Sequence, residues 1–543
     1  MHIPLPLQGC DPGASPVKVL ITDPLAPAGV ETLAAEHDVD VMLQLSKPEL
    51  LEVIGGYDAL VVRSQTQVDA DVIAAGKRLK VIARAGVGVD NVDLDAATRC
   101  GIVVCNAPQS NIISAAEHTV AMLLAVARNI PQAHAALSEG RWERSRWTGT
   151  EVYGKTLGVL GLGRIGSLVA KRCQAFGMDV IAYDPFLAPD RAARMDVELL
   201  PTVEAVLSRA DFVTVHLPRT PETANLLDAD RLALMRPDAR LINVARGGII
   251  DESALADALR EGRLAGAALD VFAAEPLKDS PLFGLPNVVL TPHLGASTSE
   301  AQDKAGTQVA EYVTLALAGE FIPSALNLQG GPLDDELRPF LPLSERLGRL
   351  LSAIAEDGIT GEISVEFLGA LAEHDNRVLG LGVLRGVLAA ASTEPVTLVN
   401  APLMAEHRGI HLREVNDPQS GDYVSLLRVR CVRRDGTVVR VAGTVLQPGD
   451  RERIVEVWNT AMDVEPTPHM AFFRYDDRPG VIGAIGTACG EAGVNIAAAQ
   501  VGRSSGGGEA IMALALDAPL THDVLRSITA SIGAHEGRAI SLP

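Results

Sequence analysis

The most constraining feature of the sequence is the glycine-rich segment Gly161-Leu162-Gly163-Arg164-Ile165-Gly166. It follows a short apolar run, Lys155–Leu160, and opens a stretch with helical periodicity, Arg164–Phe176. A strand, a G-x-G-x-x-G loop and a helix in this order predict the phosphate-binding turn of a dinucleotide-binding fold. The first glycine permits a tight turn, the second lets the backbone approach a pyrophosphate, and the third lets the helix pack on the strand. Free N–H groups at the start of the helix would then face the phosphate charge.

An acidic residue, Asp184, supports this interpretation. It ends the next predicted strand, 18 residues after Gly166. A carboxylate there can accept hydrogen bonds from the adenosine ribose hydroxyls, and it would repel a 2′-phosphate. The alternative is an aspartate that only caps the turn before Pro185. In the context of the whole strand–loop–helix unit, we predict NAD rather than NADP as the cofactor.

Strand-like apolar runs alternate with helical patterns between Val17 and Gly330. Such alternation, with strands that are apolar throughout, is typical of parallel sheets covered by helices on both faces. We therefore predict an α/β fold in which a Rossmann-type nucleotide domain, 113–297, is inserted into a substrate domain made of 17–112 and 298–330. The predicted strands are Val17–Thr22, Ala59–Arg63, Lys80–Ala83, Ile102–Asn106, Thr156–Leu160, Asp179–Tyr183, Phe212–His216, Arg240–Asn243, Gly266–Leu269 and Val288–Leu290.

Two breaks rich in proline or glycine divide the rest of the chain. The first, Gln329-Gly330-Gly331-Pro332, precedes a further α/β unit that we predict at 331–465. The second, Glu465-Pro466-Thr467-Pro468, precedes a small unit with a β-α-β-β-α pattern, predicted at 467–543. We expect residues 1–16 to form a short disordered tail. The strands predicted in the third unit are Glu362–Phe367, Val424–Val432 and Val438–Val445.

Composition narrows the function classes. The 543 residues are 47% hydrophobic and 21% charged, as in ordinary globular domains. The net charge of −21 argues against a nucleic-acid partner, because phosphate contacts need clustered basic residues. The six cysteines form no Cys-x-x-Cys pair and lack zinc-ligand spacing, so we expect no metal and free thiols in a reducing cytoplasm. No apolar run approaches the roughly 20 residues of a membrane-spanning helix, so we expect no membrane partner.

Three polar residues stand near the ends of the later predicted strands, where such sheets place their ligands. Arg246 follows Leu241–Ala245, Glu275 follows Asp270–Phe272, and His293 follows Leu290–Pro292. Oxidation of an alcohol needs a base for the hydroxyl proton, and a neutral imidazole suits that role near pH 7. A neighbouring carboxylate stabilises the imidazolium that forms, and a guanidinium offers a forked donor to a substrate carboxylate or carbonyl. We therefore predict a catalytic set for a 2-hydroxy acid.

Several segments resemble the D-isomer-specific 2-hydroxyacid dehydrogenase family, over nearly everything from Lys18 to Pro543. The matching segments are Val87–Asn91, Gly161–Gly166, Asn243–Gly248, Gly266–Phe272 and Pro292–Thr298. The resemblance implies a flavodoxin-like substrate domain, an inserted NAD domain, an α/β intervening domain and a C-terminal ACT domain. It implies Arg246, Glu275 and His293 as the catalytic residues. It also implies cofactor contacts from Gly161, Gly163, Arg164, Ile165, Gly166, Asp184, Leu217, Val244, Ala245, Asp270, Gly295 and Ala296, and from the backbone of Val87, where relatives often carry Thr.

The same resemblance implies a phosphorylated substrate, which needs cations besides Arg246. The segments Arg63-Ser64 and Arg84-Ala85-Gly86 resemble the phosphate and carboxylate cradle of the family, with Asn111 nearby. Arg144 matches a position that relatives contribute from a neighbouring subunit, although it could instead belong to a solvated run. The expected reaction is the NAD-dependent oxidation of 3-phospho-D-glycerate to 3-phosphohydroxypyruvate, the first step of phosphorylated L-serine biosynthesis. Alternatives are a reductase for 2-oxoglutarate, hydroxypyruvate or glyoxylate on the same fold, or a nucleotide-sensing scaffold.

The C-terminal segment Tyr475–Val481, followed by Gly493–Ile496, resembles an ACT domain. The resemblance implies that Tyr475, Asp477 and Asn495 contact a small regulatory ligand. Asp477 could hold an ammonium group and Asn495 could join a strand to the ligand. Because the expected reaction begins serine synthesis, we expect serine as the effector. The alternative is a purely structural dimerisation unit. In either case the chain is expected to be a homo-oligomer, a dimer or a tetramer.

Overall fold

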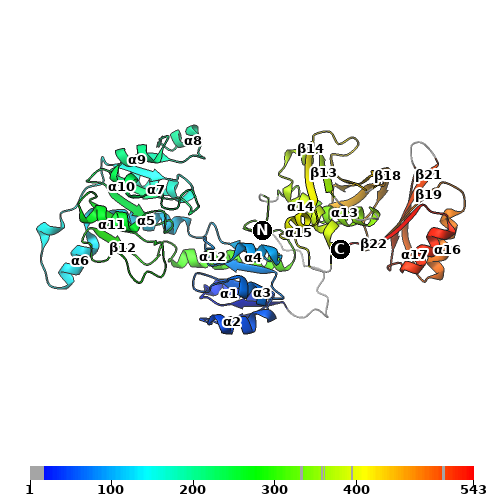
Figure 1. The fold of residues 1–543 in the computed structure, drawn as a ribbon, viewed down its shortest axis with the longest axis horizontal. Helices are drawn as coiled ribbons and strands as arrows, with labels where there is room; N and C mark the ends of the chain where they lie inside the picture. Colours follow the sequence, from blue (N-terminus) through cyan, green and yellow to red (C-terminus); the bar gives the residue numbers. More distant parts are fainter. Residues whose placement is uncertain are drawn as a thin grey trace.

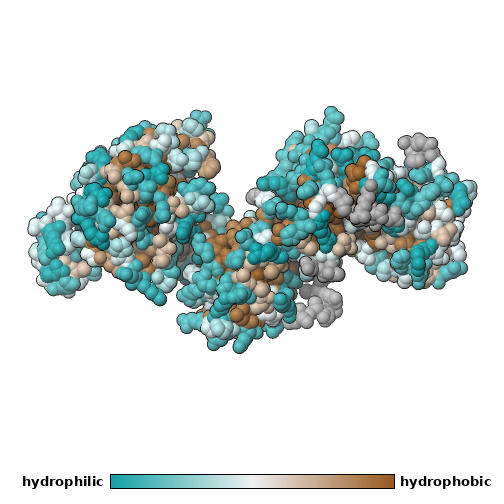
Figure 2. Space-filling model, in the orientation of Figure 1, coloured by the Kyte–Doolittle hydropathy of each residue, from teal (hydrophilic) through white to brown (hydrophobic). Residues whose placement is uncertain are grey.

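The computed structural model of the protein describes residues 17–330, 334–355, 359, 361–392, 395–433, 435–503 and 508–543. The expected tail at 1–16 lies outside the described residues. The described chain contains four β-sheets, which Figure 1 shows spread along an elongated molecule. Figure 2 shows that hydrophilic residues cover most of the visible face. None of the described helices combines the length and the apolar character needed to cross a bilayer.

The first sheet has five parallel strands in the order β2-β1-β3-β4-β5, which is the flavodoxin-like order. Strand β2 was not among the predicted strands. It is an edge strand in which aspartate alternates with valine and no residue is fully buried, so it lacks the apolar run of its neighbours. The elements are β1 (Lys18–Ile21), α1 (Pro27–Ala34), β2 (Asp38–Val41), α2 (Lys47–Val53), β3 (Ala59–Val62), α3 (Ala70–Ala75), β4 (Val81–Arg84), α4 (Leu94–Arg99) and β5 (Val103–Asn106).

The second sheet has seven parallel strands in the order β12-β11-β10-β9-β6-β7-β8, a doubly wound arrangement. It contains the six predicted strands and adds the two-residue edge strand β8, too short to show in a sequence pattern. The elements are β6 (Thr156–Leu160), α7 (Arg164–Ala175), β7 (Asp179–Tyr183), α8 (Pro189–Ala193), β8 (Glu198–Leu199), α9 (Val203–Arg209), β9 (Phe212–Val215), α10 (Ala229–Ala233), β10 (Arg240–Asn243), α11 (Glu252–Arg260), β11 (Gly266–Leu269) and β12 (Val288–Leu290).

Two helices, α5 (Ile112–Arg128) and α12 (Ser299–Leu317), connect these sheets in opposite directions. Helix α5 leaves the first sheet and packs its buried face on the second, and Asn129 ends it in the left-handed conformation, with φ 51°. The short helix α6 (Ile130–Ser138) follows and lies at the outer end of the molecule in Figure 1. Helix α12 returns to the first sheet and meets α1 closely, since a Cβ at Gly29 would lie 2.7 Å from the Gly306 backbone.

The third sheet has six strands in the order β14-β13-β15-β16-β17-β18. Only β13, β15 and β16 were predicted. The other three carry charged residues among their apolar ones, aspartate alone in β18, and β14 and β18 are edge strands. The elements are α13 (Phe340–Ile354), β13 (Gly361–Gly369), α14 (Arg377–Ala389), α15 (Ala401–His407), β14 (Ile410–Asp417), β15 (Ser425–Val432), β16 (Val438–Leu446), β17 (Arg451–Val457) and β18 (Thr460–Val464).

The fourth sheet is antiparallel, with the order β20-β21-β19-β22. One face carries the helices α16 and α17, and the other contributes Met470 and Phe472 to the core of the third sheet. The predicted pattern matches except for the final strand, β22, which was not predicted. The elements are β19 (His469–Asp476), α16 (Val481–Glu491), β20 (Ile496–Arg503), β21 (Glu509–Leu516), α17 (His522–Ser531) and β22 (Glu536–Ser541).

Candidate active site

A histidine–carboxylate pair lies at the carboxyl end of the second sheet. Glu275 follows β11 and His293 follows β12, and these parallel neighbours end side by side. Nδ1 of His293 lies 2.6 Å from Oε2 of Glu275, while 46% of the imidazole side chain remains exposed. An ionised carboxylate can only accept a hydrogen bond, so Nδ1 carries the hydrogen and Nε2 is left as the basic nitrogen. This tautomer suits an imidazole that takes up a proton from a ligand.

The charge of Glu275 is stabilised from two sides. Its Oε1 accepts a hydrogen bond from the Phe272 N–H at 3.0 Å, in addition to the contact with His293. Burial alone would raise the pKa of Glu275, but these two hydrogen bonds outweigh burial and hold the pKa below its usual value. Glu275 is therefore ionised at neutral pH and can accept the hydrogen of His293 Nδ1.

Arg246 stands between the first two sheets. Asn243, at the end of β10, fixes the local backbone: its side chain donates to the Arg246 carbonyl at 2.9 Å and accepts from the Ala245 N–H at 3.0 Å. The guanidinium extends towards the first sheet, where a Cβ built at Gly88 would lie 2.7 Å from Nη2 of Arg246. Arg246, which follows a strand of the second sheet, thus packs against Gly88, which follows a strand of the first.

Arg84 brings a second cation to this junction, at the end of β4. Its Nε donates to the carbonyl of Arg63 at 3.3 Å and to Oδ1 of Asn91 at 3.2 Å. Burial and the positive charges of Arg246 and Arg63 together lower the pKa of Arg84 to about 10, against the opposing effect of nearby aspartates. Arg84 is therefore close enough to both Arg246 and Arg63 to be repelled by their charges. An anionic ligand would relieve that repulsion.

The other predicted substrate residues are less uniform. A Cβ at Gly86 would lie 2.6 Å from Nη1 of Arg84, so this glycine leaves room for the guanidinium. Asn111 precedes α5, and its buried Oδ1 has no hydrogen-bond partner within the described part of the chain. Ser64 is exposed beside Arg63. Arg144 is exposed in a short 3-10 helix (Arg144–Trp147) beyond α6. None of the described contacts links it to Arg63, Arg84 or Arg246.

The glycine-rich loop has the geometry that a dinucleotide needs. Gly161 adopts a φ of 94°, and a Cβ there would lie 2.6 Å from the His216 carbonyl oxygen. A Cβ at Gly166 would lie 2.1 Å from the Gly161 carbonyl oxygen, whereas a Cβ at Gly163 would meet nothing within 4 Å. Gly163 is the N-cap of α7 and supplies no side-chain cap, so the N–H groups of Arg164 and Ile165, in the first turn, have no acceptor within the helix. This loop fits a pyrophosphate.

Asp184 lies beside this loop. Its Oδ2 accepts from the Leu162 N–H and its Oδ1 from the Phe186 N–H, both at 2.9 Å, which leaves further lone pairs on each oxygen. Leu217 lies by the loop as well, with Cδ2 3.0 Å from a Cβ built at Gly161. His216, next to it, is a poor candidate for the base, because burial lowers its pKa to about 4.

The rest of the predicted cofactor residues gather near the His293 turn. Asp270 accepts hydrogen bonds from the Leu294 N–H at 2.7 Å and from the Gly295 N–H at 2.8 Å. A Cβ built at Gly295 would lie 3.1 Å from Cγ1 of Val244. On the first sheet, the Asn106 side chain donates to the carbonyl of Val87. Ala245 and Ala296 are half-buried at the same carboxyl end of the second sheet.

Partly buried polar contacts that the sequence did not single out support the site. Among them are Asn243, Thr291 and His118, the last from α5. They were missed because each contact joins segments far apart in the sequence. One local signal was a pair of polar residues, Ser114 and His118, spaced one helical turn apart in a mostly apolar helix.

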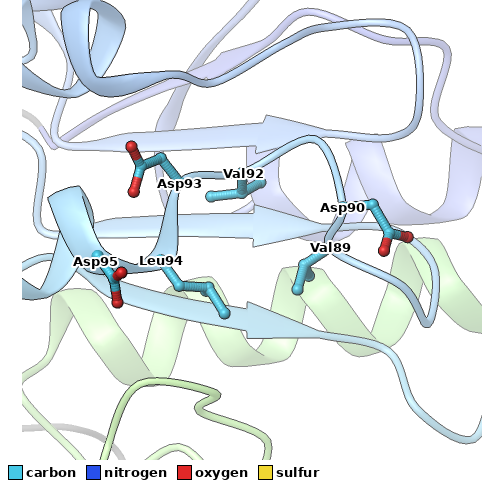
Figure 3. Close-up of a pocket in the computed structure, with 6 residues that line it drawn as sticks. All are labelled: Val89, Asp90, Val92, Asp93, Leu94 and Asp95. Atoms are coloured by element: carbon cyan, nitrogen blue, oxygen red, sulfur yellow. The ribbon is translucent and has the colours of Figure 1, made fainter. Parts of the chain in front are cut away.

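A cavity of about 390 Å³ lies by the first sheet, and neither His293 nor Glu275 lines it. Figure 3 shows that its three aspartates do not converge: Asp90 points to one side, whereas Asp93 and Asp95 lie towards the other. The remaining lining residues are Val89, Val92 and Leu94. Its acidic lining is unsuited to an anionic substrate, and the described residues contain no cluster of His, Cys, Asp and Glu that could hold a metal.

The predicted regulatory residues are not brought together within one chain. Asp477 pairs with Arg503 at 2.9 Å, whereas Asn495 donates to Asp517 at 2.8 Å. The strand register sets these pairs at opposite ends of the fourth sheet, because Asp476 lies opposite Glu509 and Ile496 lies opposite Leu516. Tyr475 is only 2% exposed and belongs to the core beneath α16.

Three family models match the chain. They are the NAD binding domain of D-isomer specific 2-hydroxyacid dehydrogenases at 120–295, the D-3-phosphoglycerate dehydrogenase intervening domain at 336–458 and the ACT domain at 469–533. D-3-phosphoglycerate dehydrogenase of Mycobacterium tuberculosis is 48% identical over 524 residues, covering 96% of this chain and 99% of the relative. The chain belongs to the D-3-phosphoglycerate dehydrogenase family. It is therefore an NAD-dependent dehydrogenase, as predicted.

Other members of the D-3-phosphoglycerate dehydrogenase family match over a similar length. The enzyme of Bacillus subtilis is 40% identical over 514 residues, covering 94% of this chain and 97% of the relative.

Among solved structures, a Thermus thermophilus protein has a TM-score of 0.53 and 38% identity, covering 57% of this chain and all of its own. D-lactate dehydrogenase of Aquifex aeolicus, solved with NAD and lactic acid, has a TM-score of 0.51 and 26% identity, covering 56% of this chain and 96% of its own.

Proposed function

We propose that the chain oxidises 3-phospho-D-glycerate at C2 to 3-phosphohydroxypyruvate, with NAD as the oxidant, and so begins phosphorylated serine synthesis. The observation that carries this proposal is the 2.6 Å contact between His293 and Glu275, at the same junction as three neighbouring arginines. Relatives that carry the name of this activity align over nearly the whole chain at 40–48% identity.

His293 acts as the base. Its Nε2 takes the proton of the C2 hydroxyl while Glu275 holds Nδ1–H and stabilises the imidazolium that forms. Bound NAD supplies the acceptor for the hydride that leaves C2. In the reverse direction His293 returns the proton to the same oxygen, so one tautomer of the residue serves both directions.

Arg246 and the arginines of the first sheet bind different anionic groups of the substrate. Arg246 follows a strand of the NAD-binding sheet, so it orients the carboxylate and the developing carbonyl next to His293. Arg84 and Arg63 bind the phosphate from the first sheet, with Ser64, the Gly86 backbone and Asn111 as further polar contacts. Arg144 reaches this site only from a second copy of the chain. A substrate with both anionic groups would draw the two sheets together.

NAD is held by the residues predicted for it. The backbone from Gly161 to Gly166, with Arg164 and Ile165 at the start of α7, faces the pyrophosphate, and Asp184 accepts from the ribose hydroxyls. Val87, Leu217, Val244, Ala245, Gly295 and Ala296 line the remaining path towards His293. Asp270 is buried behind this path and holds the Gly295 N–H. The open space above Gly163 and the free lone pairs of Asp184 support this placement.

The domain limits set out from the sequence remain predictions.

The ACT domain senses a small molecule, for which we propose serine. Asp477 supplies a carboxylate for an ammonium group and Asn495 supplies an amide. Because the two residues lie at opposite ends of the sheet, a ligand that touches both must lie between the ACT domains of two chains. Tyr475 then contributes through packing beneath Asp477. Regulation and oligomerisation are therefore parts of one proposal.

Steady-state rates test the proposed function. We expect kcat/KM for 3-phosphoglycerate to exceed that for D-glycerate by about 100-fold or more, since two charge-assisted hydrogen bonds are lost with the phosphate. Serine should lower the rate only with the ACT residues intact. Equal or better turnover of unphosphorylated 2-hydroxy acids, 2-hydroxyglutarate included, would contradict the substrate assignment. Absence of turnover with every 2-hydroxy acid would contradict the catalytic role.

A further inference from the structure

We propose that His118 is a positioning residue for His293, acting through Asp270 and Thr291. This inference rests on the proposed function, in which His293 is the base. His118 lies on α5, which connects the two N-terminal sheets, and it is 152 residues distant in sequence from its partner Asp270. Its role would be to hold the backbone turn that presents the imidazole of His293 to the substrate.

The turn that carries His293 is strained and needs support. His293 has a φ of 55°, in the left-handed region, which a non-glycine residue adopts only when its surroundings enforce it. Its N–H donates to the Asp270 carbonyl at 2.9 Å and to the Thr291 carbonyl at 3.1 Å. The next two N–H groups, of Leu294 and Gly295, donate to the two oxygens of the Asp270 side chain. Three successive amides of the turn thus converge on one aspartate.

The Asp270 side chain is completely buried, so its own orientation depends on neighbouring donors. Besides the two amides, its Oδ1 accepts from Thr291 Oγ1 at 2.5 Å and lies 3.2 Å from Nε2 of His118. Nε2 of His118 also lies 3.2 Å from Thr291 Oγ1. Because an ionised carboxylate cannot donate, Nε2 of His118 must carry the hydrogen. His118 is therefore the side-chain donor that a neighbouring helix contributes to this buried group.

A second contact ties the other end of the segment to the same helix. Oγ of Ser114 lies 2.7 Å from Oγ1 of Thr298, and Thr298 caps α12 through the Ala301 N–H. Ser114 and His118 are four residues apart, so they face the same side of α5. Helix α5 consequently holds both ends of the segment from Thr291 to Thr298, with His293 between them. Loss of either contact, Ser114 with Thr298 or His118 with Asp270, would leave the strained turn at His293 free to adopt other conformations.

Substitution of His118 tests the role directly. His118→Leu removes the donor, and we expect kcat to fall about 10- to 100-fold, as for other partners that orient a reacting group, while the Kd for NAD stays within about threefold. His118→Gln places an amide N–H at a reach close to that of Nε2 and should recover most of kcat. Glu117→Leu is the matched control, since Glu117 is its exposed neighbour on α5 and should leave kcat unchanged. Thermal midpoints show that each variant is folded.

A double-substitution cycle separates positioning from a general structural role. With His293→Ala present, adding His118→Leu should lower the residual rate no further, because the residue that it positions is gone. An equal fold-loss in both backgrounds, or a His118→Gln variant as slow as His118→Leu, would overturn the proposal. If His118→Leu does not fold, the same cycle can be measured with Ser114→Ala or His118→Gln in place of His118→Leu. Turnover retained in His293→Ala alone would overturn the proposed base as well, whereas normal turnover in His118→Leu would overturn only the positioning role.

Discussion

Nη2 of Arg246 lies against Gly88, so closely that a Cβ built on the glycine would be 2.7 Å away. The two residues belong to different sheets: Arg246 follows β10 of the second, and Gly88 follows β4 of the first. The same Cβ would lie 2.8 Å from Oδ2 of Asp90. A single missing methyl group therefore sets how near the arginine comes to the junction where the substrate is proposed to bind.

Gly88→Ala should displace the Arg246 guanidinium without unfolding the chain, because the end of an arginine side chain can move. We expect kcat/KM for 3-phosphoglycerate to fall about 10- to 100-fold, the effect of losing good geometry in one charge-assisted hydrogen bond. Gly56→Ala is the control, since a Cβ there would meet nothing within 4 Å. Steady-state kinetics of both variants give the comparison. An unchanged kcat/KM in Gly88→Ala would show that Arg246 is not held by this contact.

Arg84 should matter most for substrates that carry a phosphate. The charges of Arg246 and Arg63 repel its guanidinium and nearby aspartates offset that repulsion in part, so a bound phosphate would add a further attraction. Arg84→Ala removes this cation. We expect KM for 3-phosphoglycerate to rise about 10- to 100-fold and the preference over D-glycerate to shrink. Arg99→Ala, in the last turn of α4, serves as the control. Equal losses with both substrates would place Arg84 outside the phosphate site.

Asp184 should decide between the two nicotinamide cofactors. Asp184→Ala removes the acceptors for the ribose hydroxyls and the charge that repels a 2′-phosphate. We expect kcat/KM for NAD to fall about 10- to 100-fold while the value for NADP holds or rises. Asp190→Ala, in the first turn of α8, is the matched control. A parallel loss with both cofactors would mean that Asp184 serves the loop through its contacts with Leu162 and Phe186 instead.

Asp270 should make stability depend on pH. Burial alone would raise its pKa, but hydrogen bonds from His118, Thr291 and the amides of Leu294 and Gly295 lower it below the usual value. The unfolded chain therefore binds the proton more tightly than the folded one. The stabilisation is complete above the unfolded pKa of about 3.9 and is lost as the pH falls through the lowered folded pKa.

Asp270→Asn tests this sign, because the amide cannot accept from all of these donors. At neutral pH the variant should unfold at a lower temperature than the wild type, since buried donors lose their acceptor. The gap should narrow when both proteins are measured at about pH 3, because below the unfolded pKa of about 3.9 proton uptake stabilises the unfolded wild-type chain. A gap that widened on acidification would mean that Asp270 is not held in its ionised form.

Apolar strands were predictable, and polar edge strands were not. Every strand predicted in the first two sheets is present, because buried parallel strands are apolar along their whole length. Strands such as β2, β14 and β18 lie at sheet edges, where charged residues interrupt that pattern. The doubly wound order of the second sheet follows from the glycine-rich loop and the strands around it.

Part of the candidate site could likewise be predicted from the sequence, and part could not. Arg246, Glu275 and His293 could be singled out because each follows a predicted strand of one sheet. The contact of His118 with Asp270 could not, because α5 and β11 are neighbours only in the folded chain. The separation of Asp477 from Asn495 depends on strand register, which a resemblance to the ACT domain does not by itself specify.

The catalytic role of His293 is tested most directly by the turnover of His293→Ala with 3-phosphoglycerate, measured together with the Kd for NAD. His293 Nδ1 is held by Glu275 at 2.6 Å, so removal of the ring removes both the base and the group that this carboxylate stabilises. We predict that kcat falls by about 100- to 10,000-fold while the Kd for NAD changes by less than about threefold. A kcat within about tenfold of the wild type would contradict His293 as the general base.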